Sequence, residues 1–123
     1  MTFKDYFSKT FETSDNHHIQ SLKTHYYRCR KEEVIDAAIT SIKKMGAIIT
    51  DQNLERGEII VDASDFSGTI TITATTFTEI ALDISVITYN FLPTAKGKKV
   101  IEKFYELTDK LIPLKGIGLH ASF

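Results

Sequence analysis

Four histidines are the residues of this chain best suited to hold a metal ion or to move a proton. His17 and His18 are adjacent in a polar stretch, His25 lies among β-forming residues, and His120 stands near the C-terminus. A zinc site needs three or four ligands at workable spacing, and neither H-x-x-x-H nor H-E-x-x-H occurs. The sequence therefore predicts surface histidines and no metal site.

Cys29 is the only cysteine of the chain, so it could act as a nucleophile but cannot form an intramolecular disulfide. Three basic neighbours would favour its thiolate; they are Arg28, Arg30 and Lys31. No nucleophile motif surrounds it, however, and it stands just before a predicted helix. We therefore interpret Cys29 as a structural residue, and nothing about it indicates an oxidising compartment.

The acidic residues and the glycines give no stronger sign of catalysis. No two carboxylates of the predicted strands can be paired for acid–base work; these residues are Asp62, Asp65, Glu79 and Asp83. The Gly-Ile-Gly stretch at 116–118 lacks the rest of a phosphate-binding loop. The sequence predicts no catalytic residue and no cofactor.

The stretch KTHYYRCRK, residues 23–31, mixes basic and aromatic side chains in the way that single-stranded nucleic acid is often bound. Alternation along a strand divides this set between two faces, with Tyr26, Arg28 and Arg30 on one and Lys23, His25 and Tyr27 on the other. The whole chain has a net charge of −1 and a pI near 6.4. We therefore expect no nucleic-acid partner.

Length and composition are those of one globular domain. The chain has 123 residues, of which 42% are hydrophobic and 25% charged. No run of apolar residues is long enough to cross a membrane, and the N-terminal stretch does not have the pattern of a signal peptide. We expect a cytoplasmic protein without a membrane partner.

Helical spacing of apolar residues appears in three places. An aromatic stripe within residues 1–11 predicts a short N-terminal helix that docks on its own domain or on a partner subunit; it consists of Phe3, Tyr6, Phe7 and Phe11. Residues 31–46 predict a long helix whose apolar stripe includes Ile35, Ile39 and Ile42. A second long helix is expected from Thr94 to just before Pro113. Its predicted stripe consists of Gly97, Val100, Ile101, Phe104, Leu107, Thr108 and Leu111.

Five strands are expected, at about 22–28, 47–53, 57–64, 68–76 and 79–91. A four-residue loop at 65–68 would place Ala63 opposite Ile70, Val61 opposite Ile72 and Ile59 opposite Ala74. A three-residue loop at 76–78 would place Ala74 opposite Ile80, Ile72 opposite Leu82 and Ile70 opposite Ile84. Both turns keep the apolar residues on one face, which favours an antiparallel meander. The alternation changes phase near Val86 and Ile87, so we expect either a bulge or cover on both faces there.

The stretch TITITATTFT places threonines opposite that apolar face. They form either a solvated outer surface, for which β-branched threonine is well suited, or a face that contacts a second subunit, a partner or the N-terminal helix. This predicted face consists of Thr69, Thr71, Thr73, Thr75, Ile87, Tyr89 and Phe91.

Together these elements predict an α+β fold: a two-layer sandwich in which two long helices cover one face of an antiparallel sheet of about five strands, with a short N-terminal helix in addition. We divide the chain into an N-terminal segment (1–21), one α+β domain (22–112) and a C-terminal tail (113–123).

Residues 22–112 resemble a recurrent small bacterial module in which a strand leads to an E-E-V-x-x-A-A helix, a four-strand meander and a closing helix. The matching positions are Glu33, Val34, Ala38, Gly46, Gly57 and Ile59. The pattern is similar to the helix-grip domains of outer-membrane assembly lipoproteins, although the lipobox cysteine of those proteins is absent. The resemblance implies the fold and brings no catalytic residues.

Two functional hypotheses follow. The first is a non-enzymatic cytoplasmic domain that acts by protein–protein contact or self-association, for example as a homodimer, through the outer face. The alternative is a module that binds a small apolar ligand in a cleft between the sheet and the helices.

Overall fold

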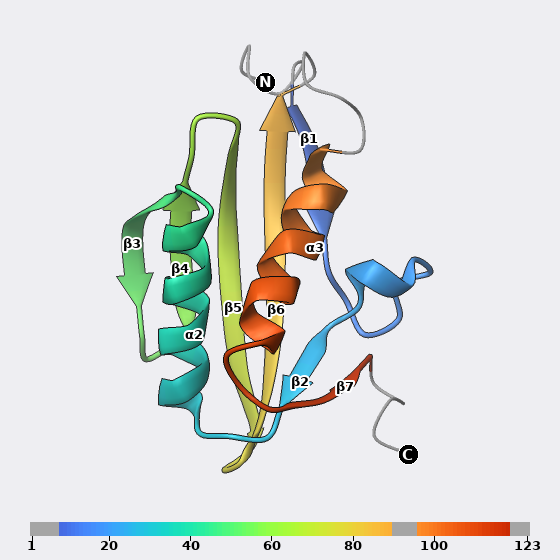
Figure 1. The fold of residues 1–123 in the computed structure, drawn as a ribbon, viewed down its shortest axis with the longest axis vertical. Helices are drawn as coiled ribbons and strands as arrows, with labels where there is room; N and C mark the ends of the chain where they lie inside the picture. The colour runs from blue at the N-terminus through green and yellow to red at the C-terminus, as the bar shows by residue number, and fades with distance from the viewer. Residues whose placement is uncertain (1–7, 90–95, 119–123) are drawn as a thin grey trace.

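The computed structural model describes residues 8–89 and 96–118 and has an α+β fold. In chain order its elements are β1 (Ser8–Glu12), the short 3₁₀ helix η1 (Gln20–Leu22), β2 (His25–Tyr27), α2 (Lys31–Lys44), β3 (Ile48–Asn53), β4 (Glu58–Asp62), β5 (Phe66–Thr76), β6 (Glu79–Tyr89), α3 (Lys96–Asp109) and β7 (Leu114–Ile117). The strands form one antiparallel sheet in the order β3-β4-β5-β6-β2-β7, and β1 also pairs with β6. Helices α2 and α3 lie on one face of the sheet (Figure 1).

Helix α2 forms where the sequence predicts it, and the charged residues at its two ends stabilise it. Glu32 and Glu33 lie in the first turn and Lys43 and Lys44 in the last, so both pairs interact favourably with the helix dipole. Gly46 follows with a φ of +81°, a conformation that suits glycine at a helix end. The residues buried by this helix are Val34, Ala37, Ala38, Ser41 and Ile42, while Ile35 and Ile39 of the predicted stripe are half-buried.

Helix α3 buries most of its predicted stripe, including Val100, Ile101 and Phe104. It ends at Asp109, and Leu111 of the predicted stripe is 43% exposed. Tyr105 was not expected in the core, yet it is only 2% exposed. Neither described α-helix has the length and apolar content that a membrane crossing requires.

The predicted register between β5 and β6 is confirmed, because Ile70 faces Ile84, Ile72 faces Leu82 and Ala74 faces Ile80. The loop differs from the prediction. Thr76 pairs with Glu79, and a shift in register between Ala74 and Thr76 absorbs the extra residue. The bulge therefore keeps the apolar residues on one face despite a tight turn.

The predicted register between β4 and β5 is wrong by four residues. Ile59 faces Ile70 and Val61 faces Gly68, because the chain turns early and the Ala63 N–H donates to the Phe66 carbonyl at 2.8 Å. Phe66 is 3% exposed and begins β5, so burial of its ring stabilises the earlier turn by roughly 2 kcal/mol. An even shift leaves each side chain on its predicted face.

Strand β6 continues without a bulge through Val86, and its pairing with β5 shows no shift there. Thr88 continues the core-facing row after Leu82, Ile84 and Val86, and it is only 2% exposed. The phase change in the sequence therefore reflects a threonine at a core-facing position, and no irregularity of the backbone.

The expectation of an N-terminal helix is wrong for the described part of that segment. Residues Ser8–Glu12 form β1, which pairs with Ser85–Tyr89 of β6. Backbone hydrogen bonds to the long strand β6 outweigh the weak preference of a short segment for helix. Phe3, Tyr6 and Phe7 lie outside the described residues.

Phe11, the last residue of the predicted aromatic stripe, packs on α3 of its own chain. A Cβ atom added to Gly97 would lie 2.1 Å from the Phe11 ring, so the ring occupies the space that a side chain would need. We expect Gly97→Ala to lower the free energy of unfolding by about 1–3 kcal/mol through overpacking.

Chemical denaturation can test this contact in a double-mutant cycle. Since Phe11→Ala removes the ring, Gly97→Ala should cost much less in the Phe11→Ala background than in the wild type. Equal losses of unfolding free energy in the two backgrounds would show that the Phe11 ring does not restrict the size of the side chain at position 97.

The C-terminal tail, where no strand was predicted, contributes one. Leu114–Ile117 form β7, which pairs with β2 with a shift in register between Tyr26 and Tyr27. The Arg28 N–H donates to the Pro113 carbonyl at 2.9 Å and the Gly118 N–H to the Thr24 carbonyl at 2.7 Å. The tail therefore covers the free edge of β2.

Candidate functional site

One edge of β6 is shared by two strands, and the gap between them is filled by a single threonine. Strand β1 pairs with Ser85–Tyr89 and β2 with Ile80–Leu82. Thr13 bridges the gap: its N–H donates to the Ile84 carbonyl at 3.0 Å, and its hydroxyl oxygen accepts the Ile84 N–H at 2.9 Å. A side-chain oxygen thus satisfies a backbone donor that neither strand reaches.

Asp83 lies at this gap and accepts two hydroxyl hydrogen bonds. Thr13 donates to its Oδ1 at 2.7 Å and Thr24 donates to the same atom at 2.6 Å. Burial raises the pKa of the Asp83 carboxyl above its ordinary value, and the two hydrogen bonds offset this effect only in part. The structure therefore holds a half-buried carboxyl that keeps its proton to a higher pH than a free aspartate does.

This raised pKa gives a testable pH dependence. The folded protein retains the Asp83 proton to higher pH than the unfolded chain, so stability falls as the pH rises from about 4 through the folded pKa. The amide introduced by Asp83→Asn does not titrate, and its oxygen can accept both hydroxyl hydrogen bonds. We therefore expect the stability of the wild type, relative to Asp83→Asn, to fall over this range in urea denaturation.

A matched control is Asp62→Asn, which alters an exposed carboxylate on β4. Its stability relative to the wild type should not follow the same pH trend. If Asp83→Asn and Asp62→Asn give parallel pH profiles, the burial of Asp83 does not determine the pH dependence.

A second polar cluster lies between β2 and α3, with Asp109 at its centre. The Tyr27 hydroxyl donates to Asp109 Oδ1 at 2.6 Å, and His25 Nδ1 lies 3.0 Å from the same atom. The His25 ring stacks on the Tyr105 ring, with centroids 3.6 Å apart and planes 2° from parallel. His25 is therefore held both through one nitrogen and through its ring face.

The two tyrosines of this cluster act as fixed hydrogen-bond donors. Burial raises the pKa of both Tyr27 and Tyr105 far above the ordinary value for a phenol, and for Tyr27 the neighbouring Asp109 adds to the effect. The Tyr105 hydroxyl donates to the Leu82 carbonyl at 2.7 Å. Both hydroxyls remain protonated at physiological pH, so neither serves as a base.

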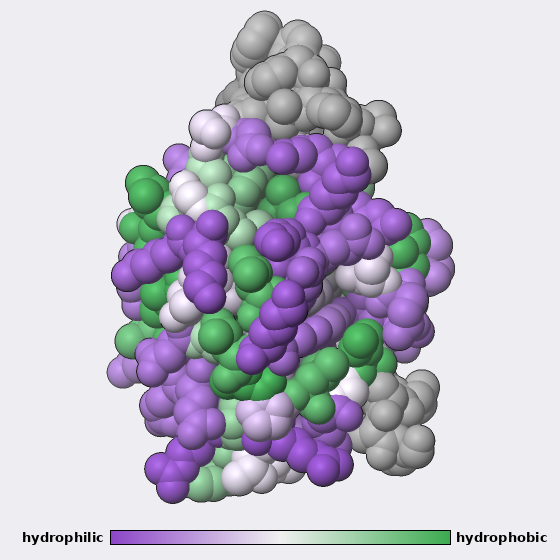
Figure 2. Space-filling view, viewed as in Figure 1, coloured by the Kyte–Doolittle hydropathy of each residue, from purple (hydrophilic) through white to green (hydrophobic). Residues whose placement is uncertain are grey.

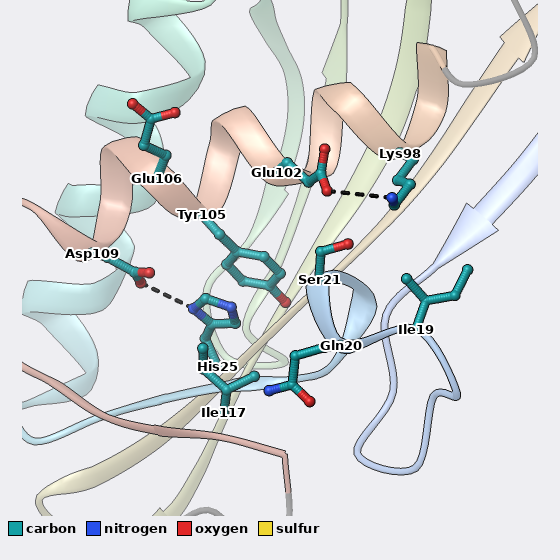
Figure 3. Close-up of a pocket in the computed structure, with 10 residues that line it drawn as sticks. All are labelled: Ile19, Gln20, Ser21, His25, Lys98, Glu102, Tyr105, Glu106, Asp109 and Ile117. Carbon is teal, nitrogen blue, oxygen red and sulfur yellow. Dashed lines mark hydrogen bonds and ion pairs between the residues drawn. The ribbon is translucent and has the colours of Figure 1, made fainter.

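A groove of about 580 Å³ opens above this cluster. Figure 3 shows the residues that line it: Ile19, Gln20 and Ser21 at η1, His25 on β2, Lys98, Glu102, Tyr105, Glu106 and Asp109 on α3, and Ile117 on β7. Ser21 Oγ is shielded from solvent and has no hydrogen-bond partner among the described residues. A buried hydroxyl without a partner costs folding free energy, and because this oxygen is shielded from solvent it is not itself a contact point for a ligand in the groove.

Charged and apolar side chains lie next to one another around the groove. Figure 2 shows hydrophilic side chains along the outer side of α3, with hydrophobic side chains beside them. Lys98 Nζ lies 3.7 Å from Glu102, and Lys110 Nζ lies 3.3 Å from Glu106. The groove thus combines apolar walls with the carboxylates of Glu102 and Glu106, each beside a lysine, and with His25 in its floor.

The predicted threonine face lies opposite the helices. Thr69 and Thr71 are half-buried and Thr73 and Thr75 exposed, whereas Ile70 and Ile72 are buried beneath the helices. Ile87 is half-buried on the threonine side and pairs with Thr10 and Ser67. The backbone of Tyr89 pairs with Ser8, and Phe91 lies outside the described residues.

The remaining candidates are dispersed. Burial and the neighbouring Glu33 raise the pKa of the Cys29 thiol to about 11, which corrects the expectation that its basic neighbours favour a thiolate. The His17 and His18 rings stack on each other with centroids 4.8 Å apart, and His120 lies outside the described residues. Among residues 8–89 and 96–118, no three histidine, cysteine or acidic side chains gather as a metal site would require.

His25 was expected at the surface, but it is only 5% exposed. Strand alternation placed His25 and Tyr27 on the same face, but only the structure shows that this face is buried. Asp109 and Tyr105 gave no comparable signal, since α3 lies far along the chain.

The chain matches no family model and no curated protein sequence. Its resemblance to helix-grip domains therefore stays a prediction.

Proposed function

We propose that the protein is a non-enzymatic binding module that holds a small organic molecule in the groove between α3, η1, β2 and β7. The observation that carries this proposal is the buried His25, fixed by Asp109 and Tyr105 at the floor of an open groove. Burying a histidine beside a half-buried carboxylate costs folding free energy, and a site that orients a ligand explains that cost better than packing alone.

The side chains near the groove favour binding over catalysis. An activated serine needs a hydrogen bond to a base, and Ser21 Oγ makes none among the described residues. The Cys29 thiol is buried and its raised pKa keeps it protonated. We place this binding in the cytoplasm, because a single cysteine such as Cys29 stays a reduced thiol there.

Native mass spectrometry of the protein purified from its host tests the proposal. We expect a co-purifying small molecule on the wild type and its loss from Ile19→Trp, whose larger side chain would fill the groove. Leu54→Trp is the matched control, because Leu54 is 50% exposed and does not line the groove. A bare wild-type mass in repeated preparations, or equal retention by both variants, would contradict the proposal.

A second candidate function is contact with a protein partner or a second copy through the outer face of the sheet. Ile60, which alternates with the buried Ile59 and Val61, is 41% exposed on that face beside Thr69. Sedimentation velocity would support self-association if the wild type dimerises and Ile60→Lys does not. A wild type that stays monomeric at high concentration would exclude the homodimer.

A further inference from the structure

The second ring nitrogen of His25 is the polar atom best placed to meet a ligand. Asp109 Oδ1 holds Nδ1 at 3.0 Å, so in the neutral ring the proton lies on Nδ1 and Nε2 is an acceptor. Nε2 has no hydrogen-bond partner among the described residues, and Figure 3 shows it turned away from Asp109 toward the η1 side of the groove. The ring is 5% exposed and stacked on Tyr105, so its direction is fixed.

The charged groups around the groove favour a cation. Three carboxylates line it, on Glu102, Glu106 and Asp109, against the single lysine Lys98. The formal charge of these four side chains is therefore −2. Lys103 and Lys110 lie 3.9 and 3.3 Å from Glu106 but outside the groove lining, so they reduce this field without supplying a donor inside it.

We propose, on the basis of the binding function above, that the ligand is a small organic ammonium with an apolar body. Its N–H donates to His25 Nε2, and its positive charge lies in the field of Glu102 and Glu106. The apolar body contacts Ile19 beside η1 and Ile117 on β7, which both line the groove. A carboxylate or phosphate ligand would face both an acceptor nitrogen and a negative rim.

Three probes that differ mainly in their head group test the ligand class: phenethylamine, phenethyl alcohol and hydrocinnamate. The readout is the long-range ¹H–¹⁵N NMR spectrum of the histidine rings, assigned by comparison with His17→Gln, His18→Gln and His120→Gln proteins. We expect phenethylamine to shift the His25 Nε2 resonance and to bind about tenfold tighter than the alcohol, with hydrocinnamate weakest.

The double variant Glu102→Gln with Glu106→Gln should reduce phenethylamine affinity to about that of the alcohol, without affecting alcohol binding. The control is Glu32→Gln with Glu55→Gln, which removes the same charge from exposed positions outside the groove. Circular dichroism confirms that both variants are folded.

The outcomes separate the ligand class from the binding function. Equal affinities for the three probes, or tightest binding of hydrocinnamate at His25, would overturn the ammonium proposal and leave the groove as a ligand site. Failure of every probe to shift the His25 nitrogens would also overturn it, and the co-purified molecule found by mass spectrometry would then define another class.

Discussion

Replacing Asp109 with alanine is expected to lower the free energy of unfolding by about 2–4 kcal/mol. Asp109 Oδ1 accepts the Tyr27 hydroxyl at 2.6 Å and contacts His25 Nδ1 at 3.0 Å. Tyr27 is fully buried and His25 is 5% exposed, so alanine leaves two donors that water cannot easily reach. Because the Asp109 side chain is 26% exposed, some water can enter, and the loss should stay below that of a fully buried pair.

The conservative variant separates the lost hydrogen bonds from other effects. Asp109→Asn keeps an acceptor oxygen in the same place, so its cost should be below about 1 kcal/mol. In the double variant Asp109→Ala with Tyr27→Phe, one of the unpartnered donors is removed, and Asp109→Ala should then cost about 1 kcal/mol less than in the wild type. Equal losses for Asp109→Ala and Asp109→Asn in urea denaturation would contradict this role for Oδ1.

Asp109 also connects stability to the proposed binding. If Asp109 orients His25 for a ligand, Asp109→Ala should weaken phenethylamine binding more than it weakens phenethyl alcohol binding, because the tautomer that accepts from the ammonium is no longer favoured. NMR titration of the folded variant at low temperature measures both affinities.

Replacing Gly57 with alanine is expected to cost about 3 kcal/mol, because two effects act together. Gly57 has a φ of +69°, and an added Cβ would lie 2.1 Å from the backbone carbonyl oxygen of Ile72. The same two residues are joined by a hydrogen bond from the Ile72 N–H to the Gly57 carbonyl at 2.7 Å. Since the added Cβ would meet a backbone atom of β5, no side-chain rotation can relieve the clash.

Gly46 provides the matched control within the same chain. Its φ is +81°, but a Cβ added there meets no atom within 4 Å. Gly46→Ala therefore measures the conformational strain alone, and we expect a cost of about 1 kcal/mol. Thermal or chemical unfolding should separate the two variants by about 2 kcal/mol, which is the contribution of the close approach to Ile72. Similar costs at both positions would show that the strands adjust to the added methyl group.

Local patterns in the sequence determined the central part of the fold. The alternation of apolar residues with threonine predicted which face of β5 and β6 lies under the helices, and the pairing of Ile72 with Leu82 confirms it. Helical spacing likewise predicted α2 and most of α3. Such predictions succeed because a side chain's direction within a strand or helix follows from the backbone repeat alone.

Tertiary contacts decided the edges of the sheet and the candidate site. Residues 8–12 become a strand because β6 offers unpaired backbone groups, and residues 114–117 do so because β2 does. The contact between His25 and Asp109 joins residues 84 positions apart, and no repeat in the sequence relates them. The site therefore depends on the packing of α3 against β2, since only that packing brings an otherwise ordinary histidine, tyrosine and aspartate to the floor of one groove.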